Sequence, residues 1–320
     1  MTDIWKKHIS VLYNELINSV NITKSENMIV DCTLWMAGHF IWVAKKLNFW
    51  DTIIWFDADI KNLELAKIRI TEELENIEFI ENISMKNKNK INIILINSNF
   101  WNLKTELNNI WVEEITGIYY DLGLSSLHLD EAERWFSFMN EGPLDMRLDK
   151  SSWITAKQII NSYTASELRE VFMKYWESSQ SNKLSHKIVD LRKQKKFNTT
   201  FDLAEIIPGP PKEKAKIFQA LRIETNKELE VLENSLKQAI ELLKSKWIIF
   251  VISFHSLEDR VIKQILKKET RDCICSDIVC SCNHKKSLKL LQKKPILPSK
   301  EEISQNSRSR SAKARSAQKL

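Results

Sequence analysis

Short apolar runs alternate with amphipathic stretches along the first part of the chain. Four runs rich in isoleucine and other apolar residues have the length of buried strands. They cover residues 28–33, 53–58, 91–96 and 115–121. Two stretches have apolar residues near helical spacing, and they cover residues 40–47 and 60–74. Strands that alternate with helices in this way predict an α/β fold with a doubly wound, parallel sheet.

The pattern changes in the second half of the chain. Residues 151–206 are helical in pattern, polar and charged, and "IIPGPPKE" at 206–213 is a Pro/Gly break. A long helix is predicted over 214–244, a fifth strand over 247–253 and a further helix from residue 256. We therefore expect an α/β core, formed by residues 1–134 and 214–320, with a helical insertion at residues 135–213.

Composition and charge narrow the class of protein. Hydrophobic residues make up 43% and charged residues 28% of the 320-residue chain, as in globular proteins. No apolar run has the length of about 20 residues that a membrane span needs, and the N-terminus lacks a signal peptide, so we predict a cytoplasmic protein. The net charge is +6, and residues 306–320 contain five Lys or Arg and no acid. Such a tail is either a nucleic-acid contact or a solvated end.

Tryptophan and glycine occur in unusual numbers. The chain has 11 Trp and 5 Gly, whereas ordinary usage predicts roughly 22 Gly. Several Trp stand where turns favour glycine, namely Trp35, Trp50, Trp135 and Trp247. We hypothesise that many or all of these residues are glycine in the cell, because a UGA codon has been read as Trp. The alternative is a Trp-rich protein whose indoles pack in the core.

Acidic residues stand at the ends of the first two predicted strands. Asp31 begins "DCTLWMAGHF" at 31–40, and Asp57 lies about 20 residues beyond the small-residue turn, where an acid commonly meets a ribose. The turn has neither the G-x-G-x-x-G pattern nor the Lys-Ser/Thr of a phosphate loop. This favours a ligand with a ribose but no pyrophosphate, such as S-adenosylmethionine. Alternatively, these acids are only caps and turn formers.

The stretch "YYDLGLSSLHLDEAERWFSFMNEGPLDMRLD", residues 119–149, has a more specific composition. Asp121 ends the fourth predicted strand, at the carboxyl edge where α/β sheets bind ligands. The loop that follows ends in Asp145, Arg147 and Asp149, with several Phe and Met residues close to these charges. This mixture indicates a structured active-site loop that covers a base.

Four of the five cysteines lie close together in "CICSDIVCSCNH", residues 273–284. They are Cys273, Cys275, Cys280 and Cys282. In a reducing compartment such a cluster favours metal binding over disulfides. Four thiolates can form a tetrahedral zinc site, although C-x-C is less regular than C-x-x-C. The alternative is that they are unliganded thiols in a surface loop.

Together these motifs resemble one family nearly from end to end. The chain is similar to the RsmH (MraW) family, methyltransferases that act on N4 of a cytidine in the decoding region of 16S ribosomal RNA. The matching motifs, beyond those quoted above, are "HISVLYNEL" at 8–16, "FDAD" at 56–59, "NSNF" at 97–100, "KYWE" at 174–177, "FQALRIETNKEL" at 218–229, "VISFHSLEDRVIK" at 251–263 and "NSRSRSAKAR" at 306–315.

The resemblance implies a Rossmann-like class I methyltransferase fold with an inserted helical domain. The α/β core would bind S-adenosylmethionine and the insertion would recognise RNA. The implied partner is 16S ribosomal RNA within the small ribosomal subunit, and a homodimer is compatible with the family. Relatives have glycine where this chain has Trp35, Trp135 and Trp176, and usually also at Ala37.

The resemblance also implies site residues, carried over by motif. The expected cofactor contacts are Ala37, Gly38, His39, Asp57, Phe100, Asp121 and His128. His128 stands where many relatives have Gln. Asp121 is the first candidate to accept the proton of the reacting amine, and Asp145 is the second. His255 and Asp259 are third candidates, since they can equally cap and brace the helix that follows them.

Two other functions compete with this interpretation. If the Trp residues at glycine positions are genuine and block the cofactor, the protein is a non-catalytic RNA-binding factor in ribosome assembly. A DNA amino-methyltransferase is disfavoured, because the chain has no Asn/Asp-Pro-Pro-aromatic motif and its one Pro-Pro pair stands at 210–211.

Overall fold

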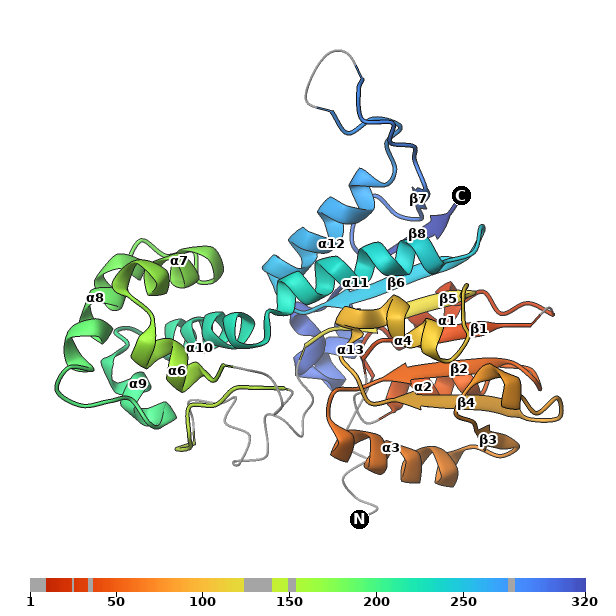
Figure 1. Cartoon of the computed structure of the whole chain (residues 1–320), viewed down its shortest axis with the longest axis horizontal. Coiled ribbons are helices and arrows are strands. Elements are labelled where there is room, and N and C mark those ends of the chain that lie inside the picture. The colour runs from red at the N-terminus through yellow and green to blue at the C-terminus, as the bar shows by residue number, and fades with distance from the viewer. Residues whose placement is uncertain (1–9, 25, 34–36, 124–139, 149–153, 276–279) are drawn as a thin grey trace. The chain divides into compact units, whose positions relative to one another are not determined.

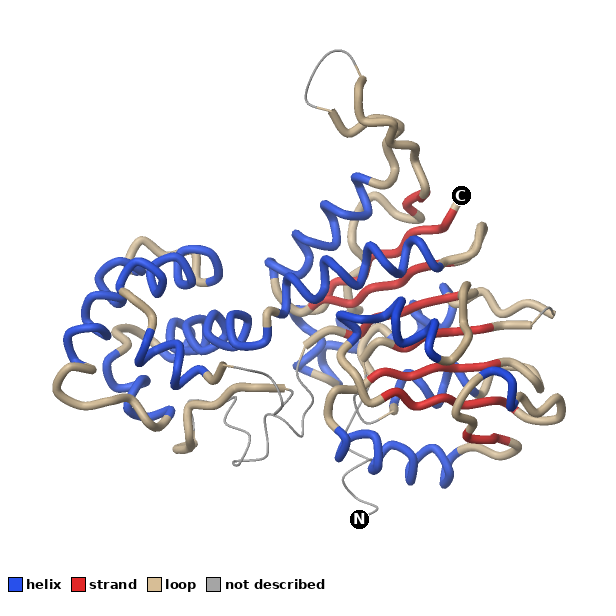
Figure 2. Tube along the Cα trace, viewed as in Figure 1, coloured by secondary structure: helices blue, strands red, loops and turns tan. Residues whose placement is uncertain are grey.

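The computed structural model describes residues 10–24, 26–33, 37–123, 140–148, 154–275 and 280–320. The chain forms two compact units. One comprises Met1–Gly123 with Val231–Leu320, and the other Leu124–Glu230. The first contains the sheet and the second is helical, as the two kinds of element show in Figure 2. The unit boundaries therefore lie at 123/124 and 230/231, whereas the sequence placed them at 134/135 and 213/214.

The sheet has eight strands in the order β3-β4-β2-β1-β5-β6-β8-β7. Their bounds are β1 Met28–Asp31, β2 Thr52–Phe56, β3 Ile77–Phe79, β4 Ile91–Ile96, β5 Gly117–Asp121, β6 Ile248–Ser253, β7 Leu288–Leu290 and β8 Lys313–Lys319. All five predicted strands are present, and they pair with one another in parallel. The predicted doubly wound sheet is confirmed, and its order reverses at β1, which pairs with both β2 and β5.

Helices cover both faces of the sheet (Figure 1). The α-helices of this unit are α1 Tyr13–Ser19, α2 Gly38–Ala44, α3 Ile60–Glu73, α4 Leu103–Asn109, α11 Glu228–Leu242, α12 Ser256–Lys268 and α13 Lys300–Gln305, and its 3₁₀ turns are Ile83–Met85, Phe100–Asn102 and Ser307–Ser311. Successive strand residues point to opposite faces. Val30 therefore packs in the apolar cluster with α4, α11 and α12, and Ile29 in the cluster with α1, α2 and α3.

The helical unit contains α6 Ala156–Ser162, α7 Ala165–Tyr175, α8 Ser181–Leu191, α9 Thr200–Ile206 and α10 Pro211–Asn226. Capping boxes fix the starts of three of them, with Thr155, Thr164 and Thr199 as the N-caps. The single helix predicted over 214–244 is wrong. Lys227 takes the left-handed conformation with φ 51° and ends α10, and α11 begins at the next residue.

The basic segment near residue 320 is a strand rather than a tail. Residues 313–319 form β8, which pairs antiparallel with β6 on one side and β7 on the other. Ala314 and Ala317 are fully buried, and the guanidinium of Arg315 donates to Asp259 at 2.6 and 3.2 Å. The apolar side chains of β8 are only methyl groups, so hydrophobic periodicity does not reveal the strand.

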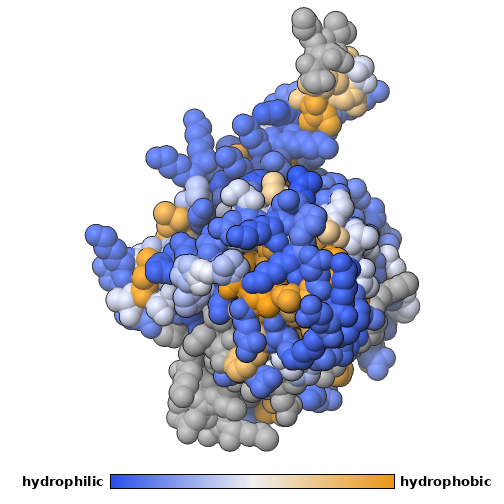
Figure 3. All heavy atoms as spheres, turned by 90° about the vertical axis from the view of Figure 1, so that its left-hand side faces the viewer, coloured by the Kyte–Doolittle hydropathy of each residue, from blue (hydrophilic) through white to orange (hydrophobic). Residues whose placement is uncertain are grey.

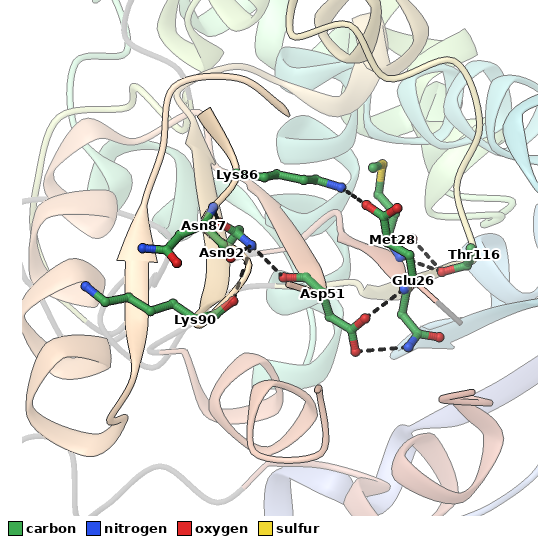
Figure 4. A network of polar contacts seen from close by, with 9 residues as sticks. Glu26, Met28, Asp51, Lys86, Asn87, Lys90, Asn92 and Thr116 are labelled. Carbon is green, nitrogen blue, oxygen red and sulfur yellow. Dashed lines mark hydrogen bonds and ion pairs between the residues drawn. The ribbon is translucent and has the colours of Figure 1, made fainter. Parts of the chain in front are cut away.

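A buried polar network holds the amino-terminal edge of the sheet (Figure 4). The carboxylate of Asp51, which is 0% exposed, accepts hydrogen bonds from the backbone and side chain of Asn27 at 2.8 and 2.9 Å. The carbonyl of Asp51 accepts the N–H of Asn92 at 2.8 Å. Thr116 accepts the N–H of Met28 at 2.6 Å. Side chains thereby connect the starts of β1, β2, β4 and β5 at the edge opposite their carboxyl ends.

No helix among the described residues is long and apolar enough to cross a membrane.

The structure separates the Trp residues into groups. Trp50 and Trp111 have φ of 67° and 64°, a conformation that glycine adopts at little cost and other residues rarely adopt. Trp55 is fully buried, and its indole N–H has no hydrogen-bond partner among the described residues. The conformations of Trp50 and Trp111 agree with the glycine hypothesis, whereas Trp55, which stacks on Phe40 in the core with ring centres 4.6 Å apart, fits the alternative of packed indoles. Trp35 and Trp135 lie outside the described residues.

Two other Trp positions differ from that expectation. The left-handed residue before β6 is Lys246, with φ 74°, and not Trp247 as the sequence suggested. Trp176 has φ −91°, and its buried indole donates a hydrogen bond to Glu213 at 2.7 Å. The conformation of the chain therefore does not require glycine at either position.

We predict that Trp50→Gly and Trp111→Gly each raise the free energy of unfolding by about 1 kcal/mol, because left-handed strain is relieved. The matched control is Trp42→Gly, since Trp42 is also exposed but lies inside α2. That change should lower stability by roughly 0.5–1 kcal/mol. Denaturant titration measures all three variants.

The recoding hypothesis has its own test. Peptide mass spectrometry of the protein from its native host should find glycine at positions 50 and 111, and also at 35, 135 and 176. Tryptophan at positions 50 and 111 in native peptides would refute it.

Candidate active site

Acidic residues meet at the carboxyl edge of the sheet. Asp31 ends β1, Asp57 directly follows β2, and Asp121 ends β5. In the parallel register, Asp31 lies opposite Trp55 of β2 and Tyr119 of β5. Three acids that are far apart in sequence are therefore brought to one edge, next to the point where the strand order reverses. This is where open α/β sheets bind their ligands.

His39, in the first turn of α2, forms a buried pair with Asp121. Its Nδ1 lies 3.2 Å from Oδ2 of Asp121, and its Nε2 lies 2.8 Å from the carbonyl oxygen of Val11. His39 and Asp121 are each 5% exposed. Each ring nitrogen thus faces an oxygen acceptor, and only the doubly protonated imidazolium donates to both.

The proton of His39 is stabilised by these acceptors. Burial lowers the pKa of His39, but the charge and hydrogen bond of Asp121 and the carbonyl of Val11 outweigh burial, and the net pKa is raised. His39 therefore stays protonated to a higher pH than a free imidazole. The result is a buried ion pair that fixes the orientation of the Asp121 carboxylate.

Asp31 is the second buried carboxyl of the site. Burial raises the pKa of Asp31 to about 7, although the N–H of Thr33 opposes the rise. That N–H donates to Asp31 at 3.0 Å, and the Thr33 hydroxyl accepts the N–H of Asp121 at 2.6 Å. Thr33 therefore connects the ends of β1 and β5. The sequence analysis did not identify this residue, and its place in "DCT", directly after a strand-end acid, is the signal that could have found it.

The turn before α2 has the backbone that glycine favours. Ala37 is the N-cap of α2, with φ 59°. A residue with a side chain pays a penalty of about 1–2 kcal/mol in this conformation. The backbone thus accounts for the glycine that relatives usually have here. Gly38 and His39 follow as the first residues of the helix and are buried.

The backbone conformation is also constrained just after β5, at Gly123. Gly123 has φ 122°, and a Cβ there would lie 3.1 Å from the ring of Phe254. Both the backbone conformation and the space therefore require glycine. Phe254 directly follows β6, so the exits of β5 and β6 pack against each other beside Asp121.

Asp57 and Phe100 lie at the ends of β2 and β4. One oxygen of Asp57 accepts the N–H of Asp59 at 2.6 Å and the other lies 3.3 Å from the side-chain amide of Asn62. These contacts hold the Asp57 carboxylate at the end of β2, and carboxylate oxygens are acceptors of the kind that ribose hydroxyls need. Phe100 is half-buried and meets Tyr120 edge to face, with ring centres 5.8 Å apart.

Asp145, the second candidate to accept the proton of the reacting amine, belongs to the helical unit. The carboxylate of Asp145 accepts two hydrogen bonds from the guanidinium of Arg147, at 2.6 and 2.9 Å. His128 lies outside the described residues.

His255 and Asp259, the third candidates for the proton acceptor, have structural roles. His255 is the N-cap of α12 and forms a capping box with Glu258. Asp259 accepts the two hydrogen bonds from Arg315 of β8. They cap and brace the helix, which was the alternative that the sequence left open.

A doubly wound sheet with acidic side chains at its switch point defines a class of enzymes that bind a ribose-containing cofactor. Comparison of the sequence with known families specifies the class further. The chain belongs to the MraW methylase family, whose profile matches residues 5–320. The resemblance to this family is thereby confirmed, and the protein is a methyltransferase.

Individual relatives are similar over their whole length. The ribosomal RNA small subunit methyltransferase H of Finegoldia magna is 40% identical, with 98% of this chain and 99% of that protein covered. Proteins with the same name from Clostridioides difficile and Caldicellulosiruptor saccharolyticus are 39% and 40% identical, with the same shares covered.

The raised pKa of Asp31 predicts how stability depends on pH. Unfolded Asp ionises near pH 4, while folded Asp31 stays protonated to about pH 7. Folding therefore favours the protonated form of Asp31. The stability that this form contributes is fully present below about pH 4, and it is lost as the pH rises to about 7. Asp31→Asn should remove this loss, so the variant gains stability relative to the parent between pH 5 and pH 8.

Denaturant titrations at pH 5 and pH 8 measure this difference. Asp59→Asn removes a charge from another strand end and serves as the control. A constant stability difference between Asp31→Asn and the parent at both pH values would contradict the assignment of a neutral, buried Asp31.

Proposed function

We propose that this protein transfers a methyl group from S-adenosylmethionine to N4 of a cytidine in the decoding region of 16S ribosomal RNA. The observation that carries the proposal is the acidic edge of the sheet, with Asp57 and Asp121 at the ends of the strands on either side of β1, in a chain of the MraW methylase family. The names of the full-length relatives support the small ribosomal subunit as the substrate. The cytoplasm is the compartment in which this substrate occurs.

The residues present fit S-adenosylmethionine. The left-handed turn at Ala37 brings backbone to the ligand edge, as the approach of a cofactor requires. Asp57 offers carboxylate acceptors to a ribose, and Phe100 offers an aromatic ring to an adenine. The described part of this edge presents no lysine or arginine of a phosphate site, in agreement with a cofactor that lacks phosphate.

Asp121 is the residue that we assign to the reacting amine. When bound, S-adenosylmethionine supplies an electrophilic methyl group, so the protein mainly has to orient the acceptor and take up a proton. The lone pair of an exocyclic amine is delocalised into the ring, and a carboxylate nearby favours the positive charge that develops there. His39 holds the Asp121 carboxylate in place at 3.2 Å.

One segment of the helical unit is rich in basic residues, as expected of a surface that contacts RNA. The segment from α8 to the turn after it contains six basic residues against Asp190, and they are Lys183, Lys187, Arg192, Lys193, Lys195 and Lys196. Figure 3 shows that the outer face of this unit is mainly hydrophilic. Cationic side chains attract the phosphates of RNA without regard to sequence. We assign substrate recognition to this unit.

No observation favours a non-catalytic assembly factor.

The homodimer stays a prediction, which light scattering of the purified protein tests.

One experiment tests the proposed reaction directly. The purified protein is incubated with S-adenosylmethionine and small ribosomal subunits from a strain that lacks the modification. Nucleoside mass spectrometry should then detect N4-methylcytidine in 16S RNA. Retention of the subunits on the protein without any methylated nucleoside would favour the assembly factor instead.

Asp57→Ala should weaken the binding of S-adenosylmethionine by roughly 1–3 kcal/mol, because a buried hydroxyl pair of the ribose loses its acceptor. Isothermal calorimetry measures the affinity. The control is Asn62→Ala, which removes a neighbour of Asp57 but keeps the carboxylate. Equal affinities of the parent and Asp57→Ala would exclude Asp57 from the ribose site.

Asp121→Asn should lower the rate of methyl transfer by about 10²–10⁴-fold, since an amide does not accept the proton of the amine. Binding of S-adenosylmethionine should change much less. Single-turnover transfer of labelled methyl groups to small subunits measures the rate. Asp145→Asn is the comparison, and a larger loss in that variant would transfer the role of base to Asp145.

A further inference from the structure

The cysteine cluster lies in the connection between α12 and β7, within the sheet unit. The Sγ atoms of Cys273, Cys275, Cys280 and Cys282 all lie within 4.8 Å of one another. Sγ of Cys282 is 3.8 Å from that of Cys280 and 3.9 Å from that of Cys273. All four cysteines are free thiols. The thiols of the two C-x-C pairs therefore lie close together, although four residues separate the pairs in the sequence.

These distances are those of a tetrahedral metal site. Zinc binds thiolate sulfur at about 2.3 Å. Four sulfurs at that distance from a central ion are separated from one another by about 3.8 Å, the edge of the tetrahedron. A disulfide needs its sulfurs at about 2.05 Å. The separations of 3.8 and 3.9 Å, with every pair of Sγ atoms within 4.8 Å, are close to the first arrangement and exclude the second.

Backbone N–H groups point at the sulfurs. The N–H of Ile274 lies 3.5 Å from Sγ of Cys282, and the N–H of Cys275 lies 3.4 Å from Sγ of Cys273. The N–H of Ser281 lies 3.3 Å from Sγ of Cys275. Hydrogen bonds of this kind stabilise thiolates, the form of cysteine that binds metals. The backbone is therefore already arranged around negatively charged sulfur.

We propose that Cys273, Cys275, Cys280 and Cys282 bind one zinc ion. Four thiolates in a tetrahedral arrangement are a ligand set that suits zinc, a borderline-soft ion without a geometric preference of its own. Four protein ligands leave no open position, so the ion is structural and takes no part in methyl transfer. It fixes the connection between α12 and β7, in the described part of which Ile274 is exposed.

Metal analysis of the full-length protein tests the site. The protein is reconstituted with zinc under reducing conditions, freed of excess metal and analysed by inductively coupled plasma mass spectrometry. We expect one zinc per chain. Replacement by Co²⁺ should give the absorption bands of tetrahedral, sulfur-coordinated cobalt, a readout that requires no variant.

Variants locate the ligands. The double variant Cys280→Ser/Cys282→Ser should lose the zinc and the cobalt bands. Ser281→Ala, between the same two cysteines, should keep both. Reconstituted parent protein without stoichiometric metal, or a double variant that retains it, would overturn the proposal. Binding of S-adenosylmethionine is measured on the same samples and should persist without zinc, so the outcome is independent of the proposed function.

Discussion

The parallel pairing of β1 with β2 on one side and β5 on the other is the constraint on which the site depends. Its register places Asp31 beside Trp55 and Tyr119, and so aligns the three strand ends. A shift of one residue would turn every side chain of a strand to the opposite face. The buried network around Asp51 at the other edge connects the same strands. Register and site are therefore fixed from both ends.

Two carboxyls and an imidazole are buried together in the site. If all three were ionised, the two carboxylates would repel each other and all three charges would be removed from water. The raised pKa of Asp31 leaves that carboxyl neutral over most of the acidic range, and His39 carries the proton that balances Asp121. The imidazole of His39 thereby orients the Asp121 carboxylate at the end of β5.

The sequence predicted the parts of the fold that have strong apolar signals. The strand at 91–96 has the predicted bounds, and α3 differs from its prediction by one residue. The break at Lys227 was missed because a single left-handed residue leaves helical periodicity intact on both sides. β3 and β7 were missed because three-residue strands carry almost no pattern.

The site was predictable where an acid follows an apolar strand, as at Asp57 and Asp121. The link made by Thr33 was not predictable, because it depends on the approach of β1 and β5 in space. The role of Val11 was hidden for a different reason, since a backbone carbonyl has no signature in the sequence.

The position of β8 has a consequence for synthesis on the ribosome. β6 is completed at Ser253, yet its antiparallel partner begins only at Lys313. While the intervening residues are translated, the nascent chain presents the edge of "IIFVIS" with unpaired backbone groups, which is the kind of edge that recruits other strands. This edge of β6 is closed only when the residues of β8 have been made. Premature termination anywhere between the two strands would leave the same edge open permanently.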